Sequence, residues 1–269
     1  MFKDELQLME INVPRAALQL ARAIAYPDLN VANYMSRLHE LSEEGADAID
    51  ESLPVAMQVD QLSEFLFVRS GFGANHGNYQ DPLNSFLNEV LDRRVGIPIT
   101  LSILYIDIAT RLGIPAYGIG LPGHFIVGIH DKEADIWVDP FHGGRVLHLS
   151  DCVDMIRLST GYEGPLEAAW FEPASAHQIL ARMLGNLRAS YVGSNAWMQA
   201  IAVIQLLRQV QPAEAEHLRD LGLVYYHKRN LPQAAHYLNS YLQRNPNAGD
   251  AHVIREGIKH ILDEWVPMN

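Results

Sequence analysis

The stretch that decides the fold of this 269-residue chain runs from residue 96 to residue 140. It begins Gly96-Ile97-Pro98 and continues as an apolar helix over 99–112, since proline suits a first helical turn, where its missing N–H costs nothing. Gly113 ends this helix. Three short runs rich in β-forming residues follow, separated by turn residues: 116–121, 125–130 and 135–138. Such runs predict an antiparallel sheet, and a helix packed beside one gives an α+β arrangement.

The same stretch carries two side chains suited to chemistry, His124 before the second run and Asp139 after the third. If these runs pair as a hairpin, they place both residues at neighbouring strand ends. An aspartate beside a histidine orients the imidazole and prepares it to act as a base. A structural His–Asp pair that ties two strands together explains the pattern equally well, and Asp139 before Pro140 also suits a turn.

The order of these features resembles the transglutaminase-like, papain-related fold. In that superfamily a cysteine opens the central helix, where the helix dipole and a nearby imidazole lower the pKa of its thiol. The resemblance implies that His124 is the base and that Asp139 orients it, and it places the nucleophile at Pro98. Because proline has no nucleophilic atom, we expect a chain that has lost this catalysis and is not an enzyme of that class.

One family resembles the chain more closely. The segments 84–101, 121–127 and 138–144 are similar to the bacterial SirB-type family, whose members join a transglutaminase-like region to tetratricopeptide repeats. Proline replaces the cysteine in that family too, so Pro98 looks like a family trait. The name of the family comes from a suggested regulatory role, and the resemblance implies such a role here.

The C-terminal part, over 177–265, is predicted to be helical with an internal period of about 34 residues. The residues that recur at this spacing are Tyr191 with Tyr225, Ala200 with Ala234, Leu207 with Tyr241, and Pro212 with Pro246. A small residue at the helix crossing and proline at the closing turn are typical of the tetratricopeptide repeat. Two such units and a last helix predict a short module that either binds a peptide on its concave face or braces the first domain.

The predicted domain organisation has three parts. A transglutaminase-like domain with a helical N-terminal part covers 1–160, and a linker rich in Gly and Pro covers 161–176. Tetratricopeptide-like helical repeats with a capping helix cover 177–269. The predicted fold class is therefore α+β with an antiparallel sheet core, followed by an all-α repeat module.

Charge and composition exclude several function classes. Lys and Arg total 20 against 32 Asp and Glu, and the resulting net charge of −12 disfavours nucleic acid and anionic membrane surfaces. A single cysteine allows no internal disulfide and no cysteine-based zinc site, and it fits a reducing cytosol. Acidic residues stand where a signal peptide needs basic ones, and polar residues interrupt the apolar stretch 95–121. We therefore expect a soluble, cytoplasmic protein.

Five residues are candidates for a ligand site: Asn88, Arg94, His124, Asp139 and His142. Asn88 lies inside a predicted helix, although asparagines near helices more often form caps and turns. Arg94 could reach a carboxylate or phosphate, although a solvated arginine or an ion pair with Glu89 explains it as well. The two histidines with Asp139 could imitate a metal site, but no tight ligand spacing supports one, so we expect no metal and no cofactor.

We predict a protein without a nucleophile that binds a polypeptide or small ligand in a cleft near His124 and Asp139. The repeats would serve protein interaction and regulation. The alternative is an atypical hydrolase or acyl-transferase that uses Cys152 or a hydroxyl such as that of Thr100. Cys152 follows Asp139 in the sequence, so this alternative needs a rearranged site. A scaffold recognised through its acidic surface is a third option, and the sequence leaves the oligomeric state open.

Overall fold

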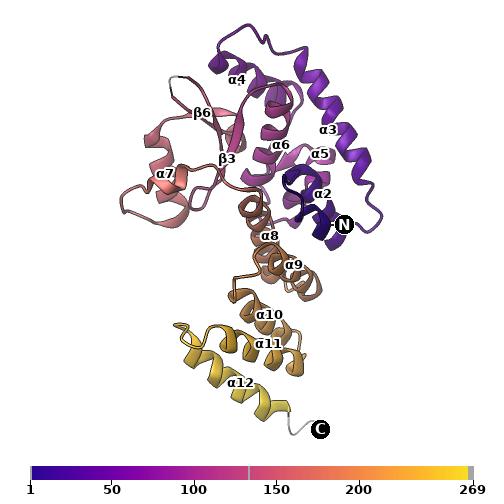
Figure 1. Cartoon of the computed structure of the whole chain (residues 1–269), viewed down its shortest axis with the longest axis vertical. Helices are drawn as coiled ribbons and strands as arrows, with labels where there is room; N and C mark the ends of the chain where they lie inside the picture. Colours follow the sequence, from indigo (N-terminus) through magenta and orange to yellow (C-terminus); the bar gives the residue numbers. More distant parts are fainter. Residues whose placement is uncertain (1, 133, 266–269) are drawn as a thin grey trace. The chain divides into compact units, whose positions relative to one another are not determined.

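The computed structural model describes residues 2–132 and 134–265. The chain divides into two compact units, Met1–Met183 and Leu184–Asn269 (Figure 1). Within the described residues, no helix is both long and apolar enough to cross a membrane. The predicted domain boundaries at 160 and 177 stay predictions.

The first unit begins with a series of helices: α1 (Phe2–Glu5), α2 (Val13–Ile24), α3 (Val31–Ala46), α4 (Val55–Ser63) and the π-helix η1 (Glu64–Arg69). Asparagine side chains fix where two of them start. Asn12 accepts a hydrogen bond from the backbone N–H of Arg15 at 2.9 Å, and Asn30 accepts one from Asn33 at 3.2 Å. Both bonds satisfy amides that an unfinished first turn leaves without partners.

The central helix of this unit is α6 (Pro98–Arg111), which is buried along most of its length. Helices α2, α3 and α5 (Leu87–Arg93) pack against it, and so do the strands β3 and β4 (Figure 1). A helix covered from several directions has no polar face, which explains why its sequence reads as nearly continuous apolar residues. Shorter elements lie near its start: β1 (Gly73–Ala74), η2 (Pro82–Ser85) and β2 (Val95–Gly96).

The sheet has four antiparallel strands in the order of the sequence: β3 (Ala116–Ile119), β4 (Ile126–Ile129), β5 (Ile136–Asp139) and β6 (Arg145–Leu147). The first three confirm the predicted antiparallel sheet. The fourth was not predicted, because two of its three residues are exposed and it therefore lacks a run of apolar residues. Gly128 on β4 is needed for close packing, since a Cβ there would lie 2.3 Å from the ring of Tyr117.

The rest of the first unit consists of η3 (Pro140–His142), which packs against α6, and of α7 (Leu149–Thr160) and η4 (Ala168–Phe171), which pack against the sheet. Cys152 and Ile156 of α7 lie in one buried cluster with Ile119 and Ile126 of the sheet. Helix α8 (Ala176–Gly193) contains the boundary between the two units.

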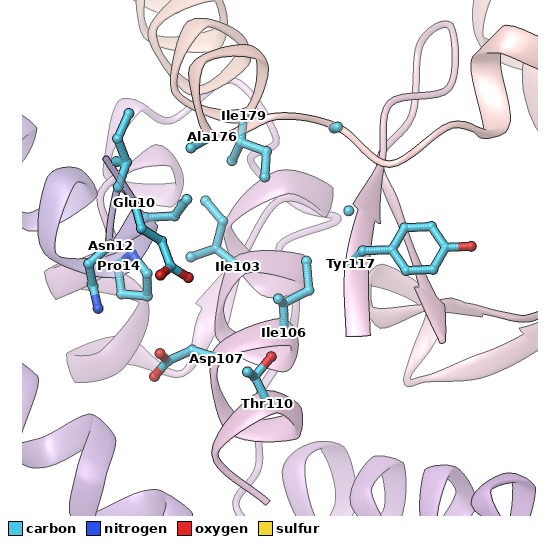
Figure 2. A pocket seen from close by; sticks show the side chains of 14 residues that line it. Glu10, Asn12, Pro14, Ile103, Ile106, Asp107, Thr110, Tyr117, Ala176 and Ile179 are labelled. Carbon is cyan, nitrogen blue, oxygen red and sulfur yellow. The ribbon is translucent and has the colours of Figure 1, made fainter. Parts of the chain in front are cut away.

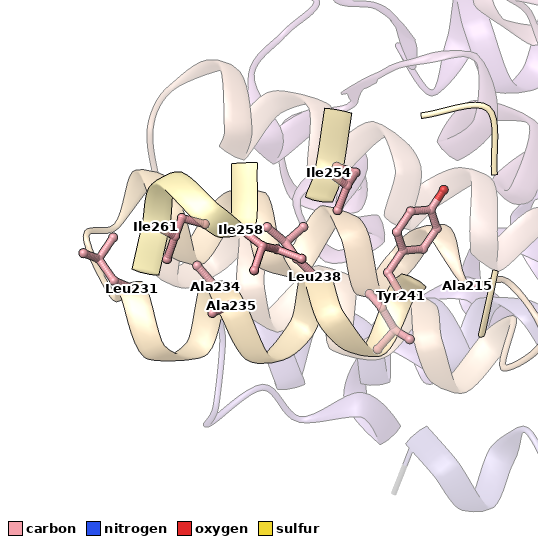
Figure 3. Close-up of a cluster of buried hydrophobic side chains, with 10 residues drawn as sticks. Ala215, Leu231, Ala234, Ala235, Leu238, Tyr241, Ile254, Ile258 and Ile261 are labelled. Atoms are coloured by element: carbon pink, nitrogen blue, oxygen red, sulfur yellow. The ribbon is translucent and has the colours of Figure 1, made fainter. Parts of the chain in front are cut away.

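The second unit continues with four helices: α9 (Trp197–Val210), α10 (Glu216–His227), α11 (Leu231–Arg244) and α12 (Ala251–Trp265). Ala200 and Ala234, one predicted repeat apart, are both fully buried. In Figure 3, isoleucines of α12 face Leu238 and Tyr241 of α11 across a shared core. The predicted fold class, an α+β part followed by helical repeats, is confirmed.

Candidate functional site

The start of helix α6 is fixed by a chain of buried polar contacts. Pro98 occupies its first turn, and the Thr100 hydroxyl accepts a hydrogen bond from the backbone N–H of Ile97 at 3.1 Å. The same hydroxyl donates to the carbonyl of Asn84 at 2.8 Å. The amide of Asn84, itself fully buried, donates to the carbonyl of Asn78 at 2.7 Å. These contacts tie the loop before α5 to the helix start, where the superfamily resemblance places the nucleophile.

The sheet register brings His124 and Asp139 to the same strand ends. Val127 of β4 pairs with Val138 of β5 in antiparallel register. Asp139 is the last residue of β5, and His124 lies just before β4 begins. The expectation that a hairpin would place them together agrees with this geometry.

Asp139 lies at the centre of a small hydrogen-bonded group. Its side chain is only 1% exposed, and Nε2 of His124 lies 3.1 Å from both of its oxygens. Nδ1 of His142 lies 2.6 Å from Oδ2, and the backbone N–H of Phe141 donates to Oδ1 at 3.0 Å. The imidazole of His124 is 11% exposed and that of His142 is 51% exposed, so a buried carboxylate orients two rings toward the surface.

The ionisation of Asp139 sets the protons of both rings. Burial raises the pKa of its carboxyl, but hydrogen bonds and charge from His124 and then His142 outweigh burial, so the pKa lies below its usual value. The carboxylate is therefore ionised at neutral pH and only accepts hydrogen bonds. Nε2 of His124 and Nδ1 of His142 must then carry the protons that face it. A neutral His124 thus keeps Nδ1 as its hydrogen-bond acceptor.

Aromatic side chains from an earlier loop complete the group. His76 packs edge-on against Phe141 with ring centroids 5.0 Å apart, and Tyr79 does so at 6.0 Å. His124 and His142 stack with centroids 6.0 Å apart. None of His76, Tyr79 and Phe141 was predicted as a site residue, and His76 and Tyr79 lie in the loop between β1 and η2. Their distance from His124 in the chain hides the contact.

Arg182 supplies a cation that interacts electrostatically with Tyr79. Its guanidinium donates to the carbonyl of Leu121 at 2.8 Å and lies 5.9 Å from the ring centre of Phe125, the residue after His124. Burial lowers the pKa of this guanidinium. Phe125, Trp170 and Arg182 line a pocket of ≈ 300 Å³. Sequence reasoning missed Arg182 because it comes from α8, in the segment assigned to the repeats.

The candidate nucleophiles of the alternative reading lie in unreactive surroundings. Cys152 is fully buried, and burial, followed by the charges of nearby carboxylates, raises the pKa of its thiol to about 11. A neutral, buried thiol is a poor nucleophile. Thr100 is also fully buried, and its hydroxyl is engaged by the backbone of Ile97 and Asn84.

The structure places the other two predicted ligand residues elsewhere. Asn88 is buried on α5 and lines a pocket with the turn between α2 and α3. Arg94 ends α5 in a left-handed conformation with φ of 58°, donates to the carbonyl of Ser70, and stacks over Phe72 at 5.3 Å. Only His124, Asp139 and His142 of the five candidates are brought together.

These three residues could also hold a metal ion. Among the described residues, they form the single set of at least three His, Cys, Asp or Glu whose ligand atoms converge, all within 4.8 Å. Two imidazoles and a carboxylate suit a divalent transition metal. The protons that face Asp139 would have to leave before an ion could bind. The expectation of no metal stays a prediction.

A larger pocket of ≈ 580 Å³ lies elsewhere in the first unit, beside α6 (Figure 2). Ile103, Ile106 and Ile179 form much of its wall, and the ring of Tyr117 points away from it. Its most buried carboxylate, Asp107, accepts a hydrogen bond from Arg111 at 2.8 Å. This pocket contains none of His124, Asp139 and His142, which together we call the His124 group. The residues suited to chemistry therefore do not line this larger pocket.

Comparison with known proteins follows the same division of the chain. Residues 32–185 match the transglutaminase-like superfamily, and residues 187–259 match the tetratricopeptide repeat. A UPF0162 protein of Xylella fastidiosa strain 9a5c is 34% identical over 93% of this chain and 90% of that protein. UPF0162 protein YchA of Escherichia coli K12 is 25% identical over 91% and 90%. Human F-box only protein 21 is 31% identical over 48% of this chain and 21% of its own length. The chain therefore belongs to the transglutaminase-like superfamily and, within it, to the UPF0162 family.

Proposed function

We propose that the transglutaminase-like unit binds a polypeptide or small ligand beside His124 and Asp139 and does not perform thiol catalysis. The observation that carries this proposal is the ionised, buried Asp139 that holds His124 and His142 at the surface beside a helix that begins with proline. Asp139 and His124 keep the orienting residue and the base of a catalytic group, while Pro98, at the position of the nucleophile, offers no reactive atom.

The cost of such a group supports a role in binding. Burying a carboxylate removes its hydration, and its partners return little net stability. A chain that needed only stability would do as well with apolar residues of similar volume. The group does present imidazole nitrogens, the partly exposed side chain of Tyr79 and aromatic faces to whatever binds there.

The proposal keeps His124, Asp139 and His142 as its site residues. Asp139 would position both rings, and the rings would contact the ligand. Asn88 is assigned to a separate pocket below, and Arg94 is left out because it completes the end of α5. The regulatory role implied by the SirB-type resemblance and the cytoplasmic location expected from the composition remain parts of this proposal.

A thermal-shift screen of short peptides and metabolites tests the proposal on the full chain. We expect at least one ligand to raise the melting temperature of the parent and to lose this effect in His124→Ala. His130→Ala is the matched control, because His130 also pairs with an aspartate, Asp135, at 3.1 Å but is 59% exposed. If no stabilisation depends on His124, or if both variants lose it equally, the proposed site is wrong.

We propose in addition that the repeat unit contacts a protein partner. A pocket of ≈ 580 Å³ in this unit is lined by Trp197, Leu223 and the buried His217, and Leu223 is 40% exposed. Apolar and charged side chains mixed in one concave surface suit a peptide. A peptide array probed with the full chain tests this. Leu223→Glu should lose the peptides that the parent binds, while Leu262→Glu, on the exposed side of α12, should keep them.

A further inference from the structure

The pocket that Asn88 lines is a separate cavity of ≈ 570 Å³ between α5 and the turn joining α2 to α3. Its wall includes Tyr26, Asp28, Tyr34 and Glu89, and no residue of the His124 group. Its volume falls in the range typical of small-molecule sites.

Asn88 is a buried residue of this wall whose side-chain oxygen lacks a hydrogen-bond donor among the described residues. It is only 2% exposed, and within the described part of the chain its Oδ1 atom has no hydrogen-bond partner. Asp92, one helical turn further along the same face of α5, accepts a hydrogen bond from the Tyr34 hydroxyl at 2.7 Å. The Asn88 amide therefore faces the α2–α3 turn. A buried amide oxygen without a donor is costly and rare, and leucine would remove that cost.

Negative charge surrounds this unpartnered oxygen. Asp28 and Glu89 line the pocket, and neither carboxylate makes a hydrogen bond or ion pair with any described residue. Asp92 is different, because Arg37 at 2.5 Å and Tyr34 already satisfy it. The pocket thus combines two unpaired carboxylates with an unpaired acceptor and has no lining cation.

This chemistry selects an organic cation over a metal ion. Among the described residues, ligand atoms of three His, Cys, Asp or Glu converge only at His124, Asp139 and His142. The three carboxylates of this pocket, Asp28, Glu89 and Asp92, therefore do not converge on one small ion, whereas a larger cation can contact them separately. The net charge of −12 also favours the approach of cations.

We propose that this pocket binds an alkylammonium ligand of the diamine class. One N–H of the ammonium group donates to Oδ1 of Asn88, and Glu89 and Asp28 balance the charge. Tyr26 and Pro27 flank the carbon chain. The site is independent of the function proposed for His124, so either can be wrong without the other.

Isothermal titration of the full chain with 1,4-diaminobutane tests the proposal. The same four-carbon chain with a trimethylammonium group at each end is the matched probe, because it carries the same two positive charges but has no N–H to donate. We expect the diamine to bind the parent at least about 10-fold more tightly than this bis-trimethylammonium probe, the usual effect of a hydrogen bond to a charged group. Asn88→Leu should remove this preference, and Glu89→Gln should weaken diamine binding several-fold.

Two measurements separate a lost site from a lost fold. Because Leu removes an unpartnered polar atom, Asn88→Leu without ligand should melt at or above the temperature of the parent. Glu40→Gln, which removes an exposed carboxylate of α3 outside the pocket, should bind the diamine as the parent does. The proposal is overturned if the parent binds no diamine, if Asn88→Leu binds it unchanged, or if Glu40→Gln weakens binding as much as Glu89→Gln.

Discussion

Replacing Gly222 with alanine tests how closely helices α10 and α11 approach each other. A Cβ at this position would meet Cγ of Leu238 at 2.6 Å, Cδ2 at 2.7 Å and its backbone nitrogen at 3.1 Å. The Leu238 side chain is 2% exposed within the core drawn in Figure 3, so it has little room to turn aside. The backbone contact also requires the helices to separate. The substitution therefore overpacks the repeat unit.

Two opposing effects set the size of the change. Alanine in a helix interior is favoured over glycine by about 1 kcal/mol. Overpacking costs about 1–3 kcal/mol, and we expect the upper half of that range because both a side chain and a backbone atom must move. The expected net loss is about 1–2 kcal/mol. Gly257 in α12 is the matched control, since apart from its chain neighbours and its own helix backbone no described atom lies within 4 Å of a Cβ there. Gly257→Ala should therefore stabilise by about 1 kcal/mol.

Urea unfolding followed by circular dichroism measures both variants, with one transition fitted for each unit. For a denaturant dependence of about 1–2 kcal/mol per M, Gly222→Ala should lower the midpoint of the repeat unit by about 1 M. Gly257→Ala should raise it by about 0.5–1 M. Shifts of the same sign for both variants would refute the reasoning, because helix propensity would then outweigh the contact with Leu238.

Three further predictions concern single side chains. Asp139 has a folded pKa below its usual 3.8, so its stabilising contribution is complete above about pH 4 and is lost as the pH falls through the folded pKa. The difference in unfolding free energy between the parent and Asp139→Asn should therefore shrink below about pH 4, and a difference that stays constant down to pH 3 would contradict this. Burial, followed by nearby carboxylates, raises the pKa of the Cys152 thiol to about 11. Cys152 should therefore resist iodoacetamide at pH 8 in the native chain and react in urea. Rapid labelling of the native chain would favour the thiol alternative. Asn230→Ala should destabilise the repeat unit by about 1 kcal/mol in urea unfolding, because Asn230 caps α11 through the backbone N–H of Gln233 at 3.3 Å, and an unchanged midpoint would argue against the cap.

Much of the fold could be predicted because local rules and tertiary packing agree. Pro98 opens α6 and Gly113 follows its end, as the sequence indicated. The buried alanines of the repeats stand where the period of about 34 residues placed small residues. Strand β6 was not predicted because two of its three residues are exposed, so its sequence has no apolar pattern typical of a strand. Its pairing with β5 holds it in the sheet.

The candidate site was only partly predictable. His124 and Asp139 were found because they flank adjacent strands, and His142 because it follows Asp139 closely in the sequence. Tyr79 contacts Phe141, and Arg182 contacts Leu121, from distant segments, and sequence spacing carries no information on such contacts. Asn88 was predicted as a ligand residue, but the sequence could not show that it faces the α2–α3 turn, because the residues of that turn are far from it in the chain.

The π-helix η1 has a consequence for how this chain tolerates insertions and deletions. It continues α4 with a wider turn and carries Phe67, whose ring stacks on Tyr105 of α6 with centroids 6.2 Å apart. A Cβ at Gly144, just after His142, would also lie 2.9 Å from that ring. A π-helical turn holds about one residue more than an α-helical turn, so deleting one residue within η1 would restore an ordinary α-helical turn and leave the flanking residues on nearly their original faces. Deleting a second residue would rotate the residues on one side of the deletion by about 100° relative to the other. This segment therefore has room to lose one residue but not two.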